Sequence, residues 1–567
     1  MYNIIELFSG IGSQAKALRN MNIEINTVGT CEWDIHAIIA YDLIHNPADI
    51  PQDILMMDKK QLLEKLKKYT FSNSGKEALD YESLRTYSLL TLQRLYASIL
   101  RNHNYVDVSA LDGAVLPGNI DILTYSFPCQ DLSNVGAFHG YNKGIDKDSG
   151  SRSSLLWQVG RVLSEMKAAG TKLPRFLLME NVPTLLSKRH FSNFSTWIND
   201  LRELGYVSNY YELNAASFGV PQNRPRLLMI SVFVGNNCAE NELVVQYFKH
   251  KKAADIVEEY KQSEFYHEYS VSDLLRTDYS DKNLFEEAVE CTPNDTESRQ
   301  KIWNENPQIV LPGNQLNTNI QMIRTITTKQ DRNPNSGNLF FDSGIEGRSK
   351  FRYLTPRECM LFMGFSDSDY NALKKHNLEF HKGDALFARD KIIRMSGNSI
   401  PVKLLEGTFL QIVQIDQMLS DFRKQKNPDI WSMYITRYAG EIRQQMYKRG
   451  IRSRIPNTRY PERADIIYSR YKTAVYICDC FWHGHQCSHG QLPATNRVFW
   501  KDVVKEKSDK ESLRRKEAED MGWRAVVAWS CELESENYEG AMDDLKKAIS
   551  GDIAVAPAVS SGESDCG

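Results

Sequence analysis

At 567 residues, with 42% hydrophobic and 25% charged residues, the chain has the composition of a soluble globular protein but is too long for one hydrophobic core, so two or three domains are expected. No apolar run is long enough to span a membrane, no signal peptide precedes the first strand, and a net charge of −3 means that any DNA-binding basic surface must be local. Ten thinly spread cysteines, clustered only around residues 478–487, exclude a secreted disulfide framework and predict a cytoplasmic protein with reduced thiols and a metal site.

The N-terminal segment predicts a strand, a glycine turn and a helix. Residues 3–13 place Gly10 and Gly12 after an apolar strand, and glycines let the backbone approach a ligand closely, although a plain tight turn explains them equally well. The next strand, residues 27–33, ends at Glu32. A carboxylate at this place in an α/β sheet binds ribose hydroxyls, and the alternative is a solvated strand end.

Residues 53–58 predict a third strand with an aspartate near the same ligand, either Asp53 or Asp58, and Asp53 is preferred. Residues 59–118 predict a helical insertion with charged faces. We expect this insertion to serve packing or a partner surface rather than chemistry.

A buried strand that ends in a rigid turn follows at residues 121–133. Pro128 fixes its own φ and pushes the preceding residue into an extended conformation, so the Cys129 thiol is presented at a strand end, where open α/β sheets bind ligands. A cysteine after a proline is more often structural. The long polar loop at residues 136–154 is predicted to be a lid or a binding loop.

Two further segments carry charge at strand ends. Residues 174–183 form a predicted buried strand that ends at Glu180. In the extended segment 217–232, Arg224 and Arg226 alternate onto the same side.

Five segments, in this order, resemble the motifs of DNA (cytosine-5) methyltransferases: residues 8–12, 128–130, 180–182, 222–226 and 397–401. The resemblance covers about residues 1–418. It implies a Rossmann-like α/β catalytic domain at residues 1–234 and 324–420, interrupted by a target-recognition region at residues 235–323.

The resemblance also implies roles for single residues. S-adenosylmethionine would be held by Phe8, Gly10, Gly12, Glu32, Trp33, Asp53, Pro128 and Asn398. Cys129 would add to C6 of a flipped cytosine, and Glu180 would stabilise N3 of the ring, since C5 alone is a poor nucleophile. Arg224 and Arg226 would orient these groups, and Gln222 would contact the DNA.

The second half begins after a polar linker at residues 421–430. Residues 431–550 predict a small α/β unit, and residues 551–567 a disordered tail. Within the unit, a set of three thiols and one imidazole has the ligand types of a closed, structural zinc site: Cys480, His485, Cys487 and Cys531.

The segments 480–487, 493–500 and 522–524, with Asp465 upstream, resemble the Vsr (very short patch repair) endonucleases, whose fold is that of restriction endonucleases. That resemblance covers about residues 430–535 and implies nicking at T:G mismatches. It assigns Mg²⁺ to Asp465 and the backbone carbonyl of Ile477, general acid–base chemistry to His483, DNA wedging to Phe481, Trp482 and Trp500, and a helix-borne acid to Glu441. Two positions depart from the family pattern: Glu511 stands where an Asp is expected, and Cys478 replaces a second active-site His.

The preferred interpretation is a bifunctional, monomeric enzyme acting on double-stranded DNA, in which a cytosine-5 methyltransferase is joined to a nuclease that repairs deaminated 5-methylcytosine. One alternative makes the nuclease a restriction enzyme that cuts unmodified sites. Another makes it a non-catalytic DNA-binding module.

Overall fold

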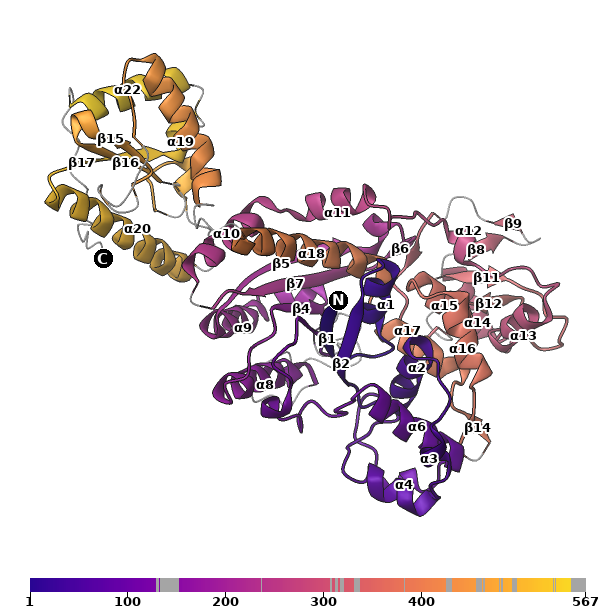
Figure 1. Ribbon diagram of the computed structural model, residues 1–567. Coiled ribbons are helices and arrows are strands. Elements are labelled where there is room, and N and C mark those ends of the chain that lie inside the picture. The colour runs from indigo at the N-terminus through magenta and orange to yellow at the C-terminus, as the bar shows by residue number, and fades with distance from the viewer. Residues whose placement is uncertain are drawn as a thin grey trace, which may run out of the picture. The chain divides into compact units, whose positions relative to one another are not determined.

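A computed structural model describes residues 1–128, 132, 152–235, 237–305, 308–311, 315–316, 321–330, 337–381, 383–424, 431–454, 461, 464–478, 480, 483–491, 497–533, 535 and 537–551. The chain forms two compact units, Met1–Leu419 and Ser420–Gly567 (Figure 1). Within these described ranges, no helix has the length and apolar character needed to cross a membrane.

The first unit is built on a six-stranded sheet in the order β2-β1-β3-β4-β7-β5. Its strands are β1 (Tyr2–Leu7), β2 (Ile25–Cys31), β3 (Ile122–Tyr125), β4 (Phe176–Asn181), β5 (Tyr206–Asn214) and β7 (Pro225–Phe233). Strands β1 to β4 are parallel, and β7 runs antiparallel to both of its neighbours. The predicted α/β class is confirmed for this unit.

Helices cover both faces of the sheet because its strands carry apolar side chains on both sides. In β1, Ile4 joins one core cluster, and its neighbour Ile5 joins the other. The Ile4 face packs against α1 (Ser13–Asn20), α2 (Ile35–His45), α10 (Cys238–His250), α11 (Ala253–Lys261) and α18 (Val402–Lys424). The Ile5 face packs against α8 (Leu156–Ala168) and α9 (Phe191–Leu204); Figure 1 shows the two helix layers.

The prediction of a strand at residues 53–58 is wrong. The chain instead forms α3 (Gln52–Leu55) and α4 (Lys59–Leu66). Asp58 caps α4, accepting from the Gln61 N–H at 2.8 Å, while the Gln61 side chain accepts from the Asp58 N–H at 2.9 Å. This reciprocal capping box stabilises a helix start and outweighs the apolar run before it.

Residues 59–118 contain two further helices, α5 (Tyr81–Leu84) and α6 (Leu89–Arg101). Leu92 and Leu95 of α6 are fully buried in the core cluster that includes α2. The insertion therefore extends the core on one side of the sheet.

A smaller lobe of the first unit follows α11, which itself still packs on the large sheet. Its helices are α12 (Val271–Leu274), α13 (Lys282–Glu290), α14 (Glu297–Glu305), α15 (Pro356–Phe362), α16 (Asp367–Lys375) and α17 (Arg389–Asn398). Its sheet has the order β12-β11-β8-β9, from β8 (Gln308–Leu311), β9 (Gln315–Leu316), β11 (Asn338–Phe340) and β12 (Phe351–Tyr353). Short pairs join β6 (Gln222–Asn223) to β10 (Ile323–Arg324) and β13 (Glu379–His381) to β14 (Asp384–Ala385).

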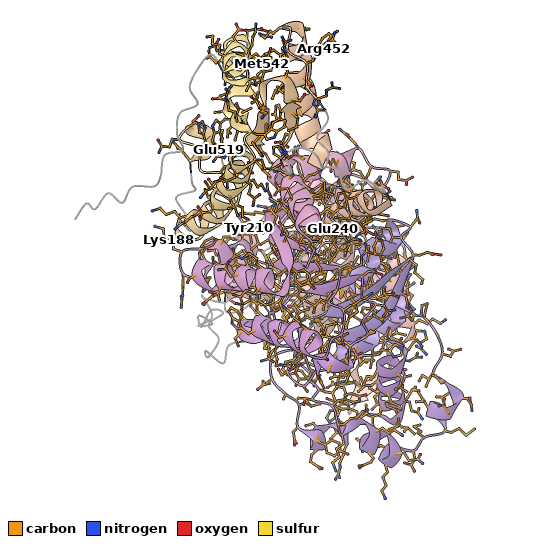
Figure 2. The ribbon with its side chains drawn as sticks, turned by 60° about the vertical axis from the view of Figure 1, so that its left-hand side comes forward. Lys188, Tyr210, Glu240, Arg452, Glu519 and Met542 are labelled. Carbon is orange, nitrogen blue, oxygen red and sulfur yellow. The ribbon has the colours of Figure 1, made fainter. Side chains whose placement is uncertain are left out.

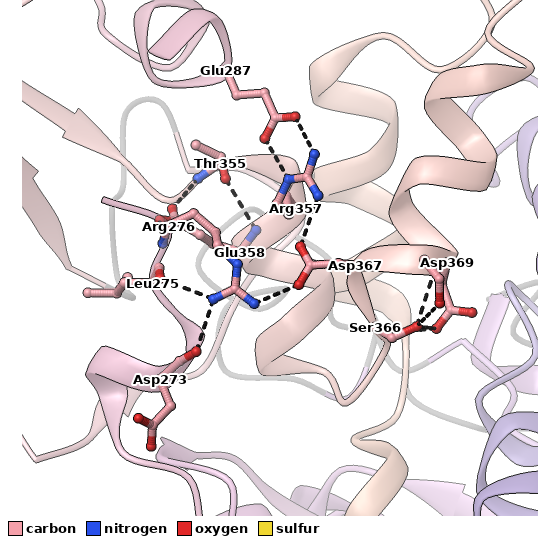
Figure 3. Close-up of polar contacts among 11 residues, drawn as sticks. Asp273, Leu275, Arg276, Glu287, Thr355, Arg357, Glu358, Ser366, Asp367 and Asp369 are labelled. Carbon is pink, nitrogen blue, oxygen red and sulfur yellow. Dashed lines mark hydrogen bonds and ion pairs between the residues drawn. The ribbon is translucent and has the colours of Figure 1, made fainter. Parts of the chain in front are cut away.

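Ion pairs, two of them buried, fix the helices of this lobe. Arg357 on α15 contacts Glu287 of α13 at 2.9 Å and Asp367 of α16 at 2.9 Å, and Arg276 reaches the same Asp367 at 2.7 Å (Figure 3). Arg352 and Glu358, both fully buried, pair at 2.8 Å. Removing one partner of a buried pair leaves an uncompensated charge, so Arg352 and Arg357 are structural.

The second unit is a three-stranded sheet, β15-β16-β17, between helices. Its elements are α19 (Trp431–Lys448), β15 (Ile466–Tyr468), β16 (Thr473–Cys478), α20 (Arg497–Asp520), β17 (Arg524–Trp529), α21 (Ser530–Leu533) and α22 (Tyr538–Ser550). Strands β16 and β17 are parallel, and Met542 of α22 is buried in the core formed with α19 (Figure 2).

The predicted linker and tail are described only in part. Because α18 continues to Lys424, residues 421–424 of the expected linker are helical. Residues 425–430 and 552–567 lie outside the described ranges.

Candidate active sites

The carboxyl end of β1 forms the glycine turn that the sequence predicts. Phe8, Gly10 and Gly12 all have positive φ, at 58°, 53° and 78°. A Cβ at Gly12 would lie 2.2 Å from Nε2 of the buried His45, so only glycine fits there. Phe8 also has a positive φ, which is unfavourable for a residue with a side chain, so the surrounding structure must hold the backbone in this conformation.

Glu32 joins the glycine turn to the end of β2. Its carboxylate accepts hydrogen bonds from the backbone N–H groups of Gly10 at 2.9 Å, Trp33 at 2.9 Å and Asp34 at 2.8 Å. Burial raises the pKa of Glu32 to about 7. The structure thus brings Glu32, Trp33 and Gly10 together, as a shared cofactor pocket requires.

Asp53 does not belong to this group. It lies exposed in the first turn of α3, because the strand that would have carried it is absent. Asp107 is an alternative aspartate close to the end of β2: the Tyr105 N–H donates to the Thr30 carbonyl at 2.9 Å, and Asp107 adds to the effects of burial and Glu32 in raising the pKa of Cys31. The signal for it was the alternating run Tyr105–Val108, hidden inside the predicted insertion.

At the centre of the sheet, Glu180 of β4 pairs with Arg226 of β7. The Arg226 Nε lies 2.9 Å from the Glu180 Oε1, and each side chain is 12% exposed. Burial raises the pKa of Glu180 above its ordinary value, although Arg226 and Arg224 oppose this shift. The arrangement places a carboxyl group whose protonated form is favoured by burial beside a fixed guanidinium.

Arg224 lies near this pair but binds elsewhere. Its guanidinium, in a side chain that is 1% exposed, donates to the carbonyls of Ile326 at 2.8 Å, Gly397 at 2.8 Å and Ser399 at 2.7 Å. Arg224 is therefore a positioning residue that ties β7 to the end of α17. Asn398, between two of these carbonyls, is exposed there.

The prediction that Gln222 contacts DNA is wrong. Gln222 is fully buried, donating from Nε2 to the Phe362 carbonyl at 3.0 Å and accepting the Ile326 N–H at 3.1 Å. Because these backbone groups use its amide, Gln222 joins the lobe to the catalytic sheet instead.

Cys129 lies outside the described residues, but the chain that leads to it is described. The Phe127 carbonyl accepts from Nδ2 of Asn181 at 3.0 Å, and the Pro128 carbonyl accepts from Oγ of Ser153 at 2.6 Å. The end of β3 is thus held against the end of β4, where Glu180 lies.

In the second unit, Asp465 lies beside β16. Its Oδ2 accepts the Ile477 N–H at 2.6 Å, and its carbonyl accepts from Arg443 at 3.0 Å. Burial raises the pKa of Asp465 to about 7, and the nearby carboxylate of Glu511 on α20 adds to the shift while the Ile477 N–H opposes it. Cys478 is 2% exposed, and burial, Glu511 and Asp465 raise its pKa, so thiol and carboxylates share one site.

The structure does not place Glu441 in this site. Positions 441 and 443 of α19 are about 200° apart around a helix, so only one of them can face Asp465. Arg443 contacts Asp465, whereas Glu441 lies near Tyr538 of α22 and contributes to raising its pKa. Phe481 and Trp482 lie outside the described residues, as does the side chain of Trp500 on α20; His483 is described, with its ring centroid 6.4 Å from that of Trp529.

Four predicted metal ligands converge at the end of the same sheet. The ligand atoms of Cys480, His485, Cys487 and Cys531 all lie within 4.8 Å of one another. The His485 Nδ1 is 3.3 Å from the Cys480 Sγ and 3.4 Å from the Cys531 Sγ, and the imidazole stacks on Trp529 at 4.2 Å. Three thiols and one imidazole at this spacing fit a tetrahedral zinc ion.

Comparison with known proteins matches each unit to a separate family. The family model described as C-5 cytosine-specific DNA methylase matches residues 89–414, and that described as DNA mismatch endonuclease Vsr matches residues 434–489. The Type II methyltransferase M2.ScrFI of Lactococcus lactis subsp. cremoris is 29% identical over 417 residues, which cover 73% of this chain and 99% of that protein.

Two further relatives support the same division. The orphan methyltransferase M.SssI of Spiroplasma monobiae is 30% identical over 408 residues, which cover 71% of this chain and 95% of that protein. The Type II nicking enzyme V.NmeAIP of Neisseria meningitidis is 35% identical over 113 residues, which cover 19% of this chain and 81% of that protein.

Proposed function

Because the chain belongs to the C-5 cytosine-specific DNA methylases and its second unit to the Vsr DNA mismatch endonucleases, we propose that it both modifies DNA and repairs the damage this modification causes. The first unit transfers a methyl group from S-adenosylmethionine to C5 of cytosine in double-stranded DNA. The second unit nicks the T:G mismatch that forms when 5-methylcytosine deaminates. The observation that carries the first activity is the buried Glu180–Arg226 pair beside the segment that leads to Cys129.

The residues present fit the methyl donor. The glycine turn, which requires glycine at position 12, lets the backbone approach a ligand closely. Glu32 bridges the N–H groups of Gly10 and Trp33 and offers a carboxylate for ribose hydroxyls. When bound there, S-adenosylmethionine supplies an electrophilic methyl group. Phe8, Trp33 and Asn398 complete the proposed contacts, and Asp107 takes the place proposed for Asp53.

The protein's own groups prepare the cytosine. The Cys129 thiolate adds to C6, and the electron pair of the C5–C6 bond becomes available at C5 for the methyl group. C5 then loses its hydrogen as a proton and the bond between Cys129 and C6 breaks, which restores the ring and the thiolate. Glu180 holds a proton at N3, so the ring does not accumulate negative charge, and Arg226 fixes the orientation of that carboxyl. Since these groups cannot reach a stacked base, the target cytosine must be flipped out of the duplex.

Glu180→Gln is expected to lower kcat for methyl transfer by about 100-fold while DNA affinity stays near that of the parent, because the amide cannot transfer a proton to N3. Since the pKa of Glu180 is raised, its protonated form persists to higher pH, and the rate of the parent enzyme should fall as pH rises through that pKa. Single-turnover methylation measured against pH tests this, with Glu212→Gln on β5 as a control. Unchanged turnover in Glu180→Gln would contradict the role.

For the nuclease, Asp465 and the Ile477 carbonyl are proposed to hold Mg²⁺, and His483 to act as general acid or base. A hard carboxylate suits this ion, which supplies an activated water for phosphodiester cleavage. Glu511 lies near Asp465 and is the candidate for the acidic partner, despite its longer side chain.

Three duplexes that carry the protein's own methylation site, mapped by bisulfite sequencing, test the whole proposal in the presence of Mg²⁺. One duplex is matched and unmethylated, one is matched and methylated, and one carries T:G in place of the methylated pair. A nick in the T:G duplex alone is the expected result. Double-strand cleavage of the unmethylated duplex would instead establish a restriction enzyme, and binding without cleavage would establish a non-catalytic module.

One zinc ion per chain is expected in the purified protein, held by the Cys480–His485–Cys487–Cys531 site. Elemental analysis measures it, and Cys487→Ser should lower the content to below half an ion because one thiolate ligand is lost. Chelation is expected to unfold the second unit, since binding of structural zinc is worth about 10 kcal/mol or more in small metal-stapled domains. Metal-free protein with an intact second unit would remove this assignment.

A further inference from the structure

We propose that a surface pocket in the small lobe of the first unit binds a phosphate group of the DNA backbone and thereby anchors the lobe on its substrate. The proposal rests on the proposed function, and it names a part of the DNA that the lobe contacts. The pocket has a volume of about 630 Å³. It lies on the lobe that carries the Arg352–Glu358 and Arg357–Glu287 pairs, and neither Glu180 nor Arg226 lines it.

Three arginines from separate segments line the pocket, and none of its lining residues is acidic. They are Arg299 on α14, Arg348 in the turn before β12 and Arg389 at the start of α17. The hydroxyl groups of Thr296 and Ser298 add neutral donors, whereas the Thr292 hydroxyl already donates to the Ala288 carbonyl at 2.8 Å. Guanidinium forks with hydroxyl donors are the groups that recognise phosphate.

The partners of Arg348 and Arg389 distinguish these two residues from the structural arginines of the same lobe. Arg348 donates to the Thr292 carbonyl at 2.6 Å, and Arg389 donates to the Glu290 carbonyl and lies 5.7 Å over the Tyr353 ring. Within the described residues, neither guanidinium pairs with a carboxylate. Arg276 and Arg357, by contrast, both pair with acids (Figure 3), and so does Arg352.

This difference has an electrostatic consequence. A guanidinium bound to a backbone carbonyl or an aromatic face is oriented but keeps its full positive charge, whereas one bound to a carboxylate is neutralised. Arg348 and Arg389 are also exposed, so an anion can reach them without burying a charge. The nearest acids in sequence are exposed and do not line the pocket: Asp295, Glu297, Glu346 and Asp390.

The same chemistry would accept a free phosphate compound, so the source must be tested. Backbone phosphate is the source that the site favours, because the pocket is open at the surface of a DNA-modifying protein whose net charge of −3 requires DNA contacts to be local. Phosphate contacts fix the register of a protein on a duplex without reading its sequence.

The test compares two variants of the full chain, Arg299→Gln and Arg348→Gln, with the control Lys301→Gln. Lys301 lies on the same helix as Arg299 but outside the pocket, its side chain is 78% exposed, and the substitution removes an equal charge. Fluorescence anisotropy of a labelled duplex at several salt concentrations measures Kd. Each arginine variant should weaken binding by about tenfold for any DNA sequence and reduce the slope of log Kd against log salt by about one. Arg348→Lys should restore much of both, because it keeps the charge, and circular dichroism verifies folding.

A second arm uses pyrophosphate as the probe and follows the melting temperature of the first unit. If pyrophosphate stabilises the parent but not the arginine variants, and DNA binding is equal in all, the pocket takes a free phosphate compound and the DNA source is overturned. If the arginine variants match Lys301→Gln in both arms, the whole proposal is overturned. Methyl transfer by the parent is measured separately. If the proposed function fails but the pocket binds DNA, methylation is absent while the slope of log Kd against log salt still differs between the parent and the arginine variants.

Discussion

Cys129→Ser is expected to reduce methyl transfer to background, a loss of about three orders of magnitude or more, because removal of a catalytic nucleophile eliminates the covalent route. A serine hydroxyl is almost entirely protonated near neutral pH and adds poorly to C6 of cytosine. The substitution is nearly isosteric, so DNA affinity and the fold of the first unit should remain as in the parent.

The measurement is transfer of labelled methyl groups from S-adenosylmethionine to a duplex, together with Kd for the same duplex. Cys291→Ala, which changes a buried cysteine in the small lobe, is the matched control and should retain activity. Normal turnover by Cys129→Ser would exclude the proposed mechanism, whereas a loss of DNA binding in parallel with activity would point to a structural role for the thiol.

Asp465→Asn is expected to lower the rate of nicking of the T:G duplex by at least about 100-fold. Replacing a residue that only orients a metal ligand can already lower activity by up to that factor. Asparagine retains an oxygen that can accept the Ile477 N–H but lacks the charge that binds Mg²⁺. Methyl transfer by the same variant should be unchanged, because the substitution lies in the other unit.

The pKa of Asp465 gives this activity a pH dependence of defined sign. Because burial and Glu511 raise that pKa to about 7, the carboxylate is lost by protonation as pH falls through this value, and nicking should fall on the acidic side. Asp544→Asn on α22, at a side chain that is 72% exposed, is the control. Equal nicking by Asp465→Asn and the parent would show that Asp465 is not the metal ligand.

The sequence predicted positions well where they depend on neighbours along the chain. Buried apolar runs followed by turn residues placed Glu32 and Glu180 at the carboxyl ends of parallel strands, where open α/β sheets bind ligands. Soft ligands close together in sequence, Cys480 to Cys487, indicated the metal site, and the structure brings the distant Cys531 to them.

The predictions failed where two local sequence patterns competed, or where residues distant in the sequence determined the contacts of a side chain. For Asp53, a capping box at Asp58 stabilised helices in place of a strand. For Gln222, the deciding groups are the backbone atoms of Ile326 and Phe362, more than a hundred residues away. For Glu441, the rotation of α19 turned Arg443 toward Asp465 instead.

By itself, the sequence determined the residue types needed for the chemistry, the order of the motifs and the alternation that buries both faces of the sheet. Only the tertiary structure decided which side chains retain their charge for function. Arg224 is occupied by three carbonyls, Arg226 faces Glu180, and Arg348 faces an open pocket, although all three are arginines in loop or strand segments. The reason is physical: the protonation, pairing and exposure of a side chain depend on the groups that packing places around it, and those groups come mainly from distant parts of the chain.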